Sequence, residues 1–333
     1  MTRGDSDGPA RLSGGSQSHP DRAHVHPMNT GLEPCRSRRL LLAGLSILYL
    51  VLTLISASAK PLWYDELFTL YLSTLERPRE ILTSLASGVD LNPPLTYFLT
   101  RSITAVLGSS ELALRLPSVL GFWTMCLCIY AFVAKRTTPI CGAVSMLFPL
   151  VTGAYAYAYE ARPYGFVLGC AGLALLAWQR AAESARRLCA LLALALSLTA
   201  ALLSHYYAVL LLVPLVTGEL VRLRSRGRPD WPVWLTFASP TLALLACLPL
   251  VSSARKFKSS FWAQPNASSI LETYFLLLPP VIWLALIGLL LVTALTSRHP
   301  RKNRSGLAGH EMVAAASLAA LPFFSILLAH GIT

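Results

Sequence analysis

Charged residues are scarce in this chain of 333 residues, of which only 13% are Asp, Glu, Lys or Arg. That share is about half the share of a soluble domain, whose surface needs charge to stay in water. Hydrophobic residues make up 54% of the sequence, and the mean hydropathy is +0.56. This composition excludes an ordinary water-soluble enzyme, and it excludes disorder for most of the chain. A helical protein embedded in a membrane is the class that fits.

Acidic residues are scarcer than basic ones, with 16 Asp and Glu against 28 Lys and Arg, so the net charge is +12. In a soluble domain such an excess would suggest a nucleic-acid partner. In a membrane protein, however, Lys and Arg gather in the cytoplasmic loops and make the whole chain basic. We therefore expect the lipid bilayer as a partner and no nucleic acid.

Cysteine pairs with the spacing of a metal site are also lacking. The chain has seven cysteines, and the pair Cys126 and Cys128 is one residue short of CxxC spacing. Neither a zinc site nor a disulfide framework is indicated. We expect these side chains to be small buried apolar residues.

The chain divides into a polar tail and a long apolar part. Residues 1–39 are rich in Gly, Ser, Pro and Arg, which predicts a disordered basic cytoplasmic tail. Residues 40–59 are long enough to cross a bilayer as a helix. The Ala57–Ala59 stretch also resembles a signal-peptidase site, so removal of this segment is the alternative. We favour an uncleaved anchor, because the run is long for a signal peptide and more spans follow.

Further apolar runs predict about nine membrane spans, so residues 40–333 form one all-α transmembrane domain. After the first run, the predicted spans cover 116–134, 140–157, 164–179, 188–203, 206–221, 232–251, 271–296 and 312–330. A shorter apolar stretch, 94–107, carries Arg101 and is expected to lie along the membrane surface.

The distribution of Lys and Arg predicts the orientation. If 94–107 does not cross, the segments on the inner side hold 19 of the 28 basic residues and the outer segments hold nine. An inner excess is typical of membrane proteins, so this topology is favoured. Residues 60–115 then form a long external loop, and 158–163 form a short second one. Half of all the acidic residues fall on this outer side.

Two motifs at the outer side carry carboxylates. Asp65 and Glu66 follow the first span directly, where they could act as a general base or bind a divalent cation. They are equally typical of the first turn of a helix. In the second motif, Glu160 and Arg162 lie in a short loop between apolar runs and beside several tyrosines. Ionisable groups at membrane depth are costly, which favours a function for this pair.

Basic groups near the outer side are candidate phosphate ligands. Arg115 lies where the chain enters a span, and it is also four residues from Glu111, the spacing of a helical ion pair. His205 occupies an outer turn and could donate to a phosphate or a sugar hydroxyl. Arg255, Lys256 and Lys258 form a basic cluster that could bind an anionic headgroup or serve as an interfacial anchor.

Taken in order, these motifs resemble the membrane glycosyltransferases of the protein O-mannosyltransferase and aminoarabinose transferase type, in their bacterial branch. The segments that carry the resemblance are Trp63–Glu66, Pro93–Tyr97, Glu111–Ser118, Tyr159–Tyr164 and His205–Tyr207. The resemblance covers about residues 40–275. It implies a helical GT-C-type fold with interfacial helices in the first external loop, and a polyprenyl-phosphate sugar as donor. One departure is Asn92, which stands where the family often has a His before the paired prolines.

The resemblance implies a single displacement at the sugar on the outer face of the plasma (inner) membrane. Asp65 would deprotonate a hydroxyl of a lipid, glycan or protein acceptor. Glu66 is a second candidate catalytic residue, with a helix cap as the alternative. Glu160 would orient the groups around Asp65 or share a divalent cation, Mg or Mn, with it. The expected substrate-binding side chains are Tyr64, Arg115, Tyr159, Arg162, Tyr164, His205, Arg255, Lys256 and Lys258, with the basic ones facing the donor phosphate.

Two other functions fit parts of the pattern. A polytopic transporter would use the charges of Glu160 and Arg162 for gating or substrate binding. The sequence shows no self-similar halves, which counts against a transporter with internal repeats. A catalytically inactive membrane scaffold is the third interpretation.

Overall fold

The computed structural model describes residues 33–183, 186–256, 266, 268–296 and 306–332. In these ranges the chain forms helices and no strand, which confirms the predicted all-α class. The chain divides into two compact units, Met1–Leu40 and Leu41–Thr333. In the first unit, only the start of helix α1 (Glu33–Ala59) is described. The candidate site and all contacts below lie in the second unit.

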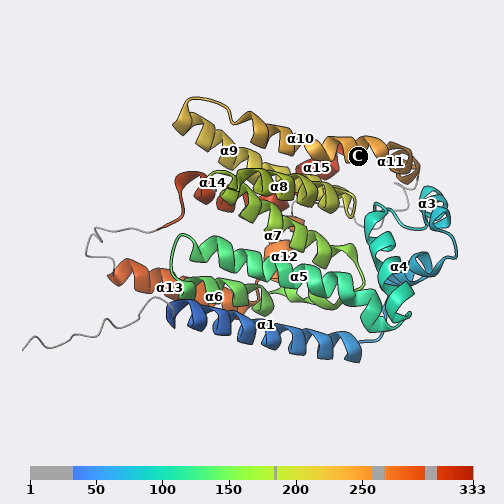
Figure 1. The fold of residues 1–333 in the computed structure, drawn as a ribbon, viewed down its shortest axis with the longest axis horizontal. Coiled ribbons are helices and arrows are strands. Elements are labelled where there is room, and N and C mark those ends of the chain that lie inside the picture. Colours follow the sequence, from blue (N-terminus) through green and yellow to red (C-terminus); the bar gives the residue numbers. More distant parts are fainter. Residues whose placement is uncertain (1–32, 184–185, 257–265, 267, 297–305, 333) are drawn as a thin grey trace, which may run out of the picture. The chain divides into compact units, whose positions relative to one another are not determined.

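The predicted external loop, residues 60–115, contains three helices: α2 (Tyr64–Thr74), α3 (Pro78–Ala86) and α4 (Leu95–Leu107). The starts of α2 and α3 are fixed in the same way, because the carboxylate at the third helical position accepts the N–H of the preceding cap residue. Glu66 accepts from Trp63 at 3.2 Å, and Glu80 accepts from Arg77 at 3.1 Å. The three helices share a small core of Leu72, Ile81, Leu85 and Tyr97. In Figure 1 this region lies at one end of α5.

The centre of the second unit is built from α5 (Glu111–Ala134), α7 (Pro163–Ala181), α8 (Arg187–Leu202), α9 (Leu212–Arg226) and α10 (Trp231–Ala246). Helices α5 and α7 lie side by side (Figure 1) and approach closely through glycines. A Cβ atom on Gly169 would stand 2.5 Å from the backbone oxygen of Gly121. Small residues allow such backbone contact between helices in membranes. The indole of Trp178 fills the core between α7, α8 and α9.

Three predicted spans are broken instead of straight. The pair α6 (Pro139–Leu147) with η1 (Phe148–Val151) and η2 (Gly153–Tyr159) bends by 80°. The pair α12 (Ser268–Leu277) and α13 (Pro280–Thr296) bends by 81°, and the pair α14 (Gly309–Ala319) and α15 (Leu321–Ile332) bends by 53°. The second and third breaks lie at or next to a proline, Pro279–Pro280 and Pro322, which cannot donate to the preceding turn. The first break lies at Thr152, three residues after Pro149. Helices η3 (Tyr206–Leu211) and α11 (Leu248–Arg255) complete the described elements.

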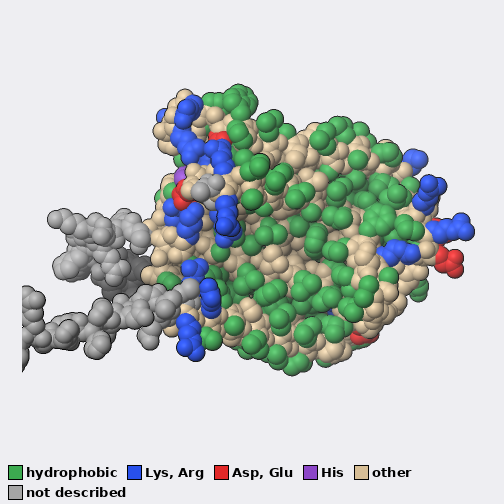
Figure 2. Space-filling model, in the orientation of Figure 1, with side chains coloured by type: hydrophobic (Ala, Val, Ile, Leu, Met, Phe, Trp, Pro, Cys, Tyr) green, Lys and Arg blue, Asp and Glu red, His purple; other side chains and the backbone are tan. Residues whose placement is uncertain are grey.

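Length and composition identify helices that fit a bilayer. Among the described residues, three helices are long and apolar enough to cross, and up to six segments qualify if each bent pair is one span. Shorter apolar helices, α4, α8 and α10, add to them. Large apolar side chains such as Leu196 and Leu242 are 69% and 73% exposed. Figure 2 shows hydrophobic side chains over much of the visible face, a surface suited to lipid contact.

Candidate active site

Glu66 at the start of α2 and Arg115 in α5 form a buried ion pair. The Arg115 Nε donates to Glu66 Oε1 at 2.9 Å and its Nη2 donates to Oε2 at 2.7 Å, with both side chains fully buried. Arg115 also donates to the backbone oxygens of Ala57, Lys60 and Pro61. The pair therefore holds the end of α1 and the start of α2 against α5.

The Glu66 carboxylate is further fixed by the loop that precedes α7. The backbone N–H of Ala161 donates to Oε1 at 2.6 Å, and that of Trp63 donates to Oε2. Burial alone would raise the pKa of Glu66, but the hydrogen bonds from Arg115, Ala161 and Trp63 outweigh it and hold the pKa below its ordinary value. The geometry favours a structural role for Glu66 and Arg115, and their expected contacts with substrate stay predictions.

Arg162, at the start of α7, lies between two carboxylates. Its Nη1 is 3.3 Å from Asp90 Oδ2, and its Nη2 is 3.8 Å from Asp65 Oδ2. Nη1 also donates to the backbone oxygen of Asp65 at 3.2 Å. The Asp65 side chain is 36% exposed, whereas those of Asp90 and Arg162 are each 10% exposed. The structure thus brings together the carboxylate and the guanidinium that sequence analysis placed in one site.

Asp90 is a site residue that sequence analysis missed. Its Oδ2 accepts the hydroxyl of Tyr97 at 2.6 Å, and its Oδ1 accepts from the Asn92 side chain at 3.0 Å. Tyr97 is only 1% exposed, so the carboxylate is held firmly in front of Arg162. The signal in the sequence is an acidic residue two positions before Asn92, the residue that departs from the family pattern.

Aromatic rings continue from Arg162 along the site. The guanidinium lies over the ring of Tyr164 at 5.8 Å, and that ring contacts Tyr157 and His205 at centroid distances of 4.9 and 5.4 Å. His205 contacts Tyr207 in turn. Burial, assisted by the charge of Arg162, lowers the pKa of His205 to about 4. His205 is therefore neutral at physiological pH. It can form hydrogen bonds, but it carries no positive charge.

A second ion pair joins the end of α1 to the loop that precedes α7. Lys60 Nζ lies 2.9 Å from Glu160 Oε1, and the ammonium is 5.6 Å from the ring centre of Tyr159 and 5.9 Å from that of Trp63. Lys60 entered the sequence analysis only as one of the outer basic residues. Tyr64 is 71% exposed, with its ring edge against Phe68.

The two carboxylates of the predicted metal site, Asp65 and Glu160, are each paired with a basic side chain. Asp65 faces Arg162 and Glu160 faces Lys60, so a shared divalent cation would have to displace these cations from the carboxylates. Within the part of the chain that the structure describes, no group of three or more His, Cys, Asp or Glu side chains is arranged to hold a metal ion. The Mg or Mn site stays a prediction, and no step below depends on it.

The predicted basic cluster is only partly described. Lys256 is exposed. Lys258 and the side chain of Arg255 lie outside the described residues, so their predicted contacts with a headgroup are left as predictions.

An apolar groove of about 240 Å³ lies beside the site, between α4, α5 and α7. Its walls include Leu99, Leu120, Phe166 and Leu173. Pro117 lines this groove and also a small cavity that Arg162 borders. An apolar surface therefore leads from the helix bundle to the edge of the charged site.

These features define a polytopic helical membrane protein with a polar, charged site at one end of its helices. Residues 91–254 match the family model described as dolichyl-phosphate-mannose-protein mannosyltransferase, which supports a GT-C-type, mannosyltransferase-like glycosyltransferase. The match confirms the family resemblance, over a shorter stretch than the motifs indicate. It includes Arg115, Arg162 and His205, and it starts just after Asp90, so Asp65 and Asp90 both lie outside it. Neither a curated protein nor a solved structure shows a significant match to the chain.

Proposed function

We propose that this protein transfers a sugar from a polyprenyl-phosphate donor to an acceptor hydroxyl at the outer face of the membrane, with inversion at the anomeric carbon. The observation that carries the proposal is the pairing of the partly exposed Asp65 carboxylate with Arg162, beside an apolar groove. A base, a phosphate ligand and a lipid-binding surface are the three parts that such a reaction needs.

In this reaction the acceptor oxygen loses its proton to Asp65 and attacks the anomeric carbon. The bond from that carbon to the phosphate oxygen breaks, and the polyprenyl phosphate leaves with the negative charge. The Arg162 guanidinium, which suits two phosphate oxygens at once, stabilises that charge. Because a single displacement takes place on the opposite face of the sugar, the configuration inverts.

The neighbouring groups have supporting roles. Asp90 binds Nη1 of Arg162, whereas the Asp65 carboxylate lies nearest Nη2, so Asp90 is a positioning residue. Tyr164 and His205 offer a ring surface and a neutral hydrogen-bonding group to the sugar. The groove between α4, α5 and α7 takes the first part of the lipid chain. Glu160 with Lys60 fixes the second external loop against the end of α1.

The test is the initial rate of sugar transfer in liposomes, with polyprenyl-phosphate mannose as the first donor and the rate normalised to folded protein. Asp65→Asn keeps the shape and loses the base, so the rate should fall at least ~100-fold. The matched control is Glu111→Gln. This change also removes one carboxylate charge, and the Glu111 side chain, at the start of α5, is 45% exposed. If Asp65→Asn keeps more than about a third of the parent rate, the loss is under ~1 kcal/mol of barrier and Asp65 is not the base.

A further inference from the structure

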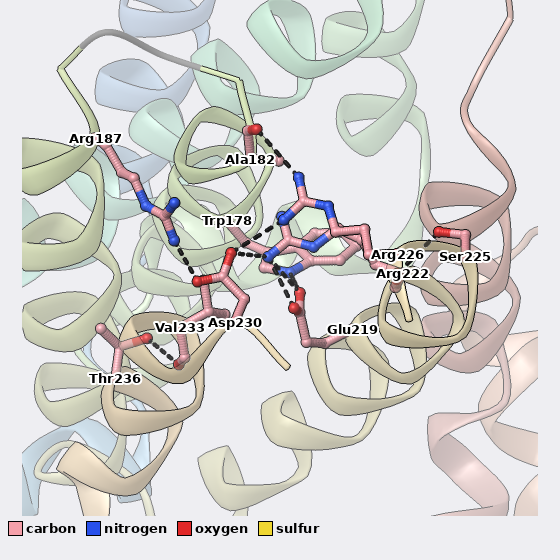
Figure 3. A network of polar contacts seen from close by, with 10 residues as sticks. All are labelled: Trp178, Ala182, Arg187, Glu219, Arg222, Ser225, Arg226, Asp230, Val233 and Thr236. Carbon is pink, nitrogen blue, oxygen red and sulfur yellow. Dashed lines mark hydrogen bonds and ion pairs between the residues drawn. The ribbon is translucent and has the colours of Figure 1, made fainter. Parts of the chain in front are cut away.

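A second polar centre lies where α7 and α9 end and α8 and α10 begin, at the opposite end of α7 from Arg162. Three arginines surround the carboxylate of Asp230 there (Figure 3). Arg222 and Arg226 donate to Oδ2 at 3.1 and 3.2 Å, and Arg187 donates to Oδ1. The proposed transfer reaction does not use this centre.

The centre has more positive than negative charge. Glu219 is its second acid, accepting from Arg222 at 2.8 Å and from the indole N–H of Trp178 at 3.0 Å (Figure 3). Two carboxylates thus face three guanidinium groups. The Arg222 side chain is only 3% exposed. Its Nε and Nη1 atoms are buried, and they find no hydrogen-bond partner in the described part of the chain. The two carboxylates therefore do not satisfy all the guanidinium donors of this centre.

Exposed apolar stripes start at this centre and run along two neighbouring helices. On α8, Leu188, Leu192 and Leu196 are 69%, 54% and 69% exposed at a spacing of four residues, which places them on one face. On α10, Trp231 and Leu235 are 67% and 69% exposed. Leu188 directly follows Arg187, and Trp231 directly follows Asp230. A basic edge above an apolar stripe matches a phospholipid, with an anionic head and aliphatic chains.

We propose that Arg187 and Arg226 bind the phosphate headgroup of an anionic glycerophospholipid, whose acyl chains lie along the exposed leucines of α8 and α10. Their side chains are 43% and 40% exposed. Arg226 also donates to the backbone oxygen of Ala182 at 3.5 Å, and the five N–H groups of a guanidinium leave further donors on both arginines. Asp230 is 7% exposed and holds both guanidinium groups in place. A zwitterionic lipid has the same phosphate but no net charge, so the surplus positive charge selects the anionic lipid.

Native mass spectrometry of the full chain in detergent tests this proposal. Phosphatidylglycerol and phosphatidylcholine with identical acyl chains are titrated separately, and their bound fractions are compared. The parent should prefer phosphatidylglycerol, and Arg187→Gln/Arg226→Gln should reduce that preference about tenfold or more, since each cation near a membrane surface contributes roughly a fivefold factor. The control is Arg77→Gln/Arg79→Gln, which removes the same charge from exposed positions of the external loop.

A preference unchanged in the Arg187/Arg226 variant, or lost equally in the control, overturns the proposal. Stronger binding of a polyprenyl monophosphate than of phosphatidylglycerol also overturns it, because the occupant would then be the carrier lipid.

A second measurement needs no change at the arginines and holds even if that variant fails to fold. The fluorescence that depends on Trp231 is obtained as the difference between the parent and Trp231→Phe in mixed vesicles. Brominated phosphatidylglycerol should quench this fluorescence more than brominated phosphatidylcholine at the same bromine content. Equal quenching by the two lipids contradicts the assigned site.

Discussion

Glu66 and Arg115 meet through hydrogen bonds of 2.9 and 2.7 Å with neither side chain exposed. Because Arg115 also binds three backbone oxygens at the junction of α1 and α2, this pair fixes the place from which Asp65 projects. Two adjacent carboxylates therefore have separate tasks, since Glu66 supports the fold and Asp65 faces the open site.

Glu66→Gln should destabilise the protein strongly. The change leaves the Arg115 charge buried without its carboxylate, which costs about 3–5 kcal/mol. Thermal unfolding in detergent should move to a clearly lower temperature. Glu111→Gln is the control, because its carboxylate lies 4.0 Å from the same guanidinium but is 45% exposed, and the expected change is within about 0.5 kcal/mol. A stable Glu66→Gln variant would show that the pair is dispensable.

Arg162→Ala should reduce transfer more than Arg162→Lys. Lysine keeps the positive charge but loses the planar fork that engages two phosphate oxygens. The measurement is the initial rate over a range of donor concentrations, with thermal unfolding as the control for folding. Equal rates in the parent and both variants would mean that Arg162 makes no contact with the donor phosphate.

Asp90→Asn should lower kcat/KM for the donor about tenfold, because a hydrogen bond to a charged group contributes about 1.5–3 kcal/mol. Without the Asp90 charge, Asp65 is the carboxylate that Arg162 still faces among the described residues, and the guanidinium is drawn toward the base. Tyr97→Phe removes the hydroxyl that holds Asp90 and should act in the same direction, more weakly. Steady-state kinetics separate kcat from KM, and parental values in both variants contradict the positioning role.

His205 should make folding stability depend on pH. Its pKa is about 4 in the folded chain, whereas an ordinary His has a pKa near 6.5. The unfolded chain therefore binds the proton first, so the stability is complete above pH ~6.5 and falls as the pH drops toward the folded pKa. His205→Gln should unfold with a weaker pH dependence between pH ~6.5 and ~4.5. Parallel curves of unfolding temperature against pH for parent and variant would exclude this contribution.

Cysteine labelling should report the predicted orientation. In a cysteine-free background, Arg79→Cys should react with an impermeant reagent added outside, and Arg228→Cys should react only after the membrane is opened. Both positions are exposed in the structure, so access to the reagent depends on the membrane alone. The opposite pattern would place the candidate site on the inner side.

Local features were predictable from the sequence. Apolar runs predict helices of the all-α class, because each run must satisfy its own backbone in a membrane. Their bends were not predicted, because mean hydropathy does not register where a proline such as Pro149 or Pro280 interrupts a run. The bends of 80° and 81° are visible only in the folded chain.

The division of tasks between neighbouring residues was not predictable. Asp65 and Glu66 look equivalent in sequence, but consecutive side chains of a helix point about 100° apart, so one is buried and the other reaches Arg162. Asp90 was missed because Arg162 stands 72 residues further along, and only the folded chain brings the two together. The proximity of Asp65 and Arg162 was expected only through the family resemblance.

The Glu66 carboxylate also imposes an order on biosynthesis. Arg115 follows it by 49 residues, and the Ala161 N–H follows by 95. When α1 and α2 leave the ribosome, every partner from beyond α2 has still to be translated. The carboxylate must stay hydrated until α5 arrives, so the α1–α2 corner cannot close against the bundle earlier. Final closure waits for the loop that also delivers Arg162, which means that the candidate active site is completed only after translation has passed the start of α7.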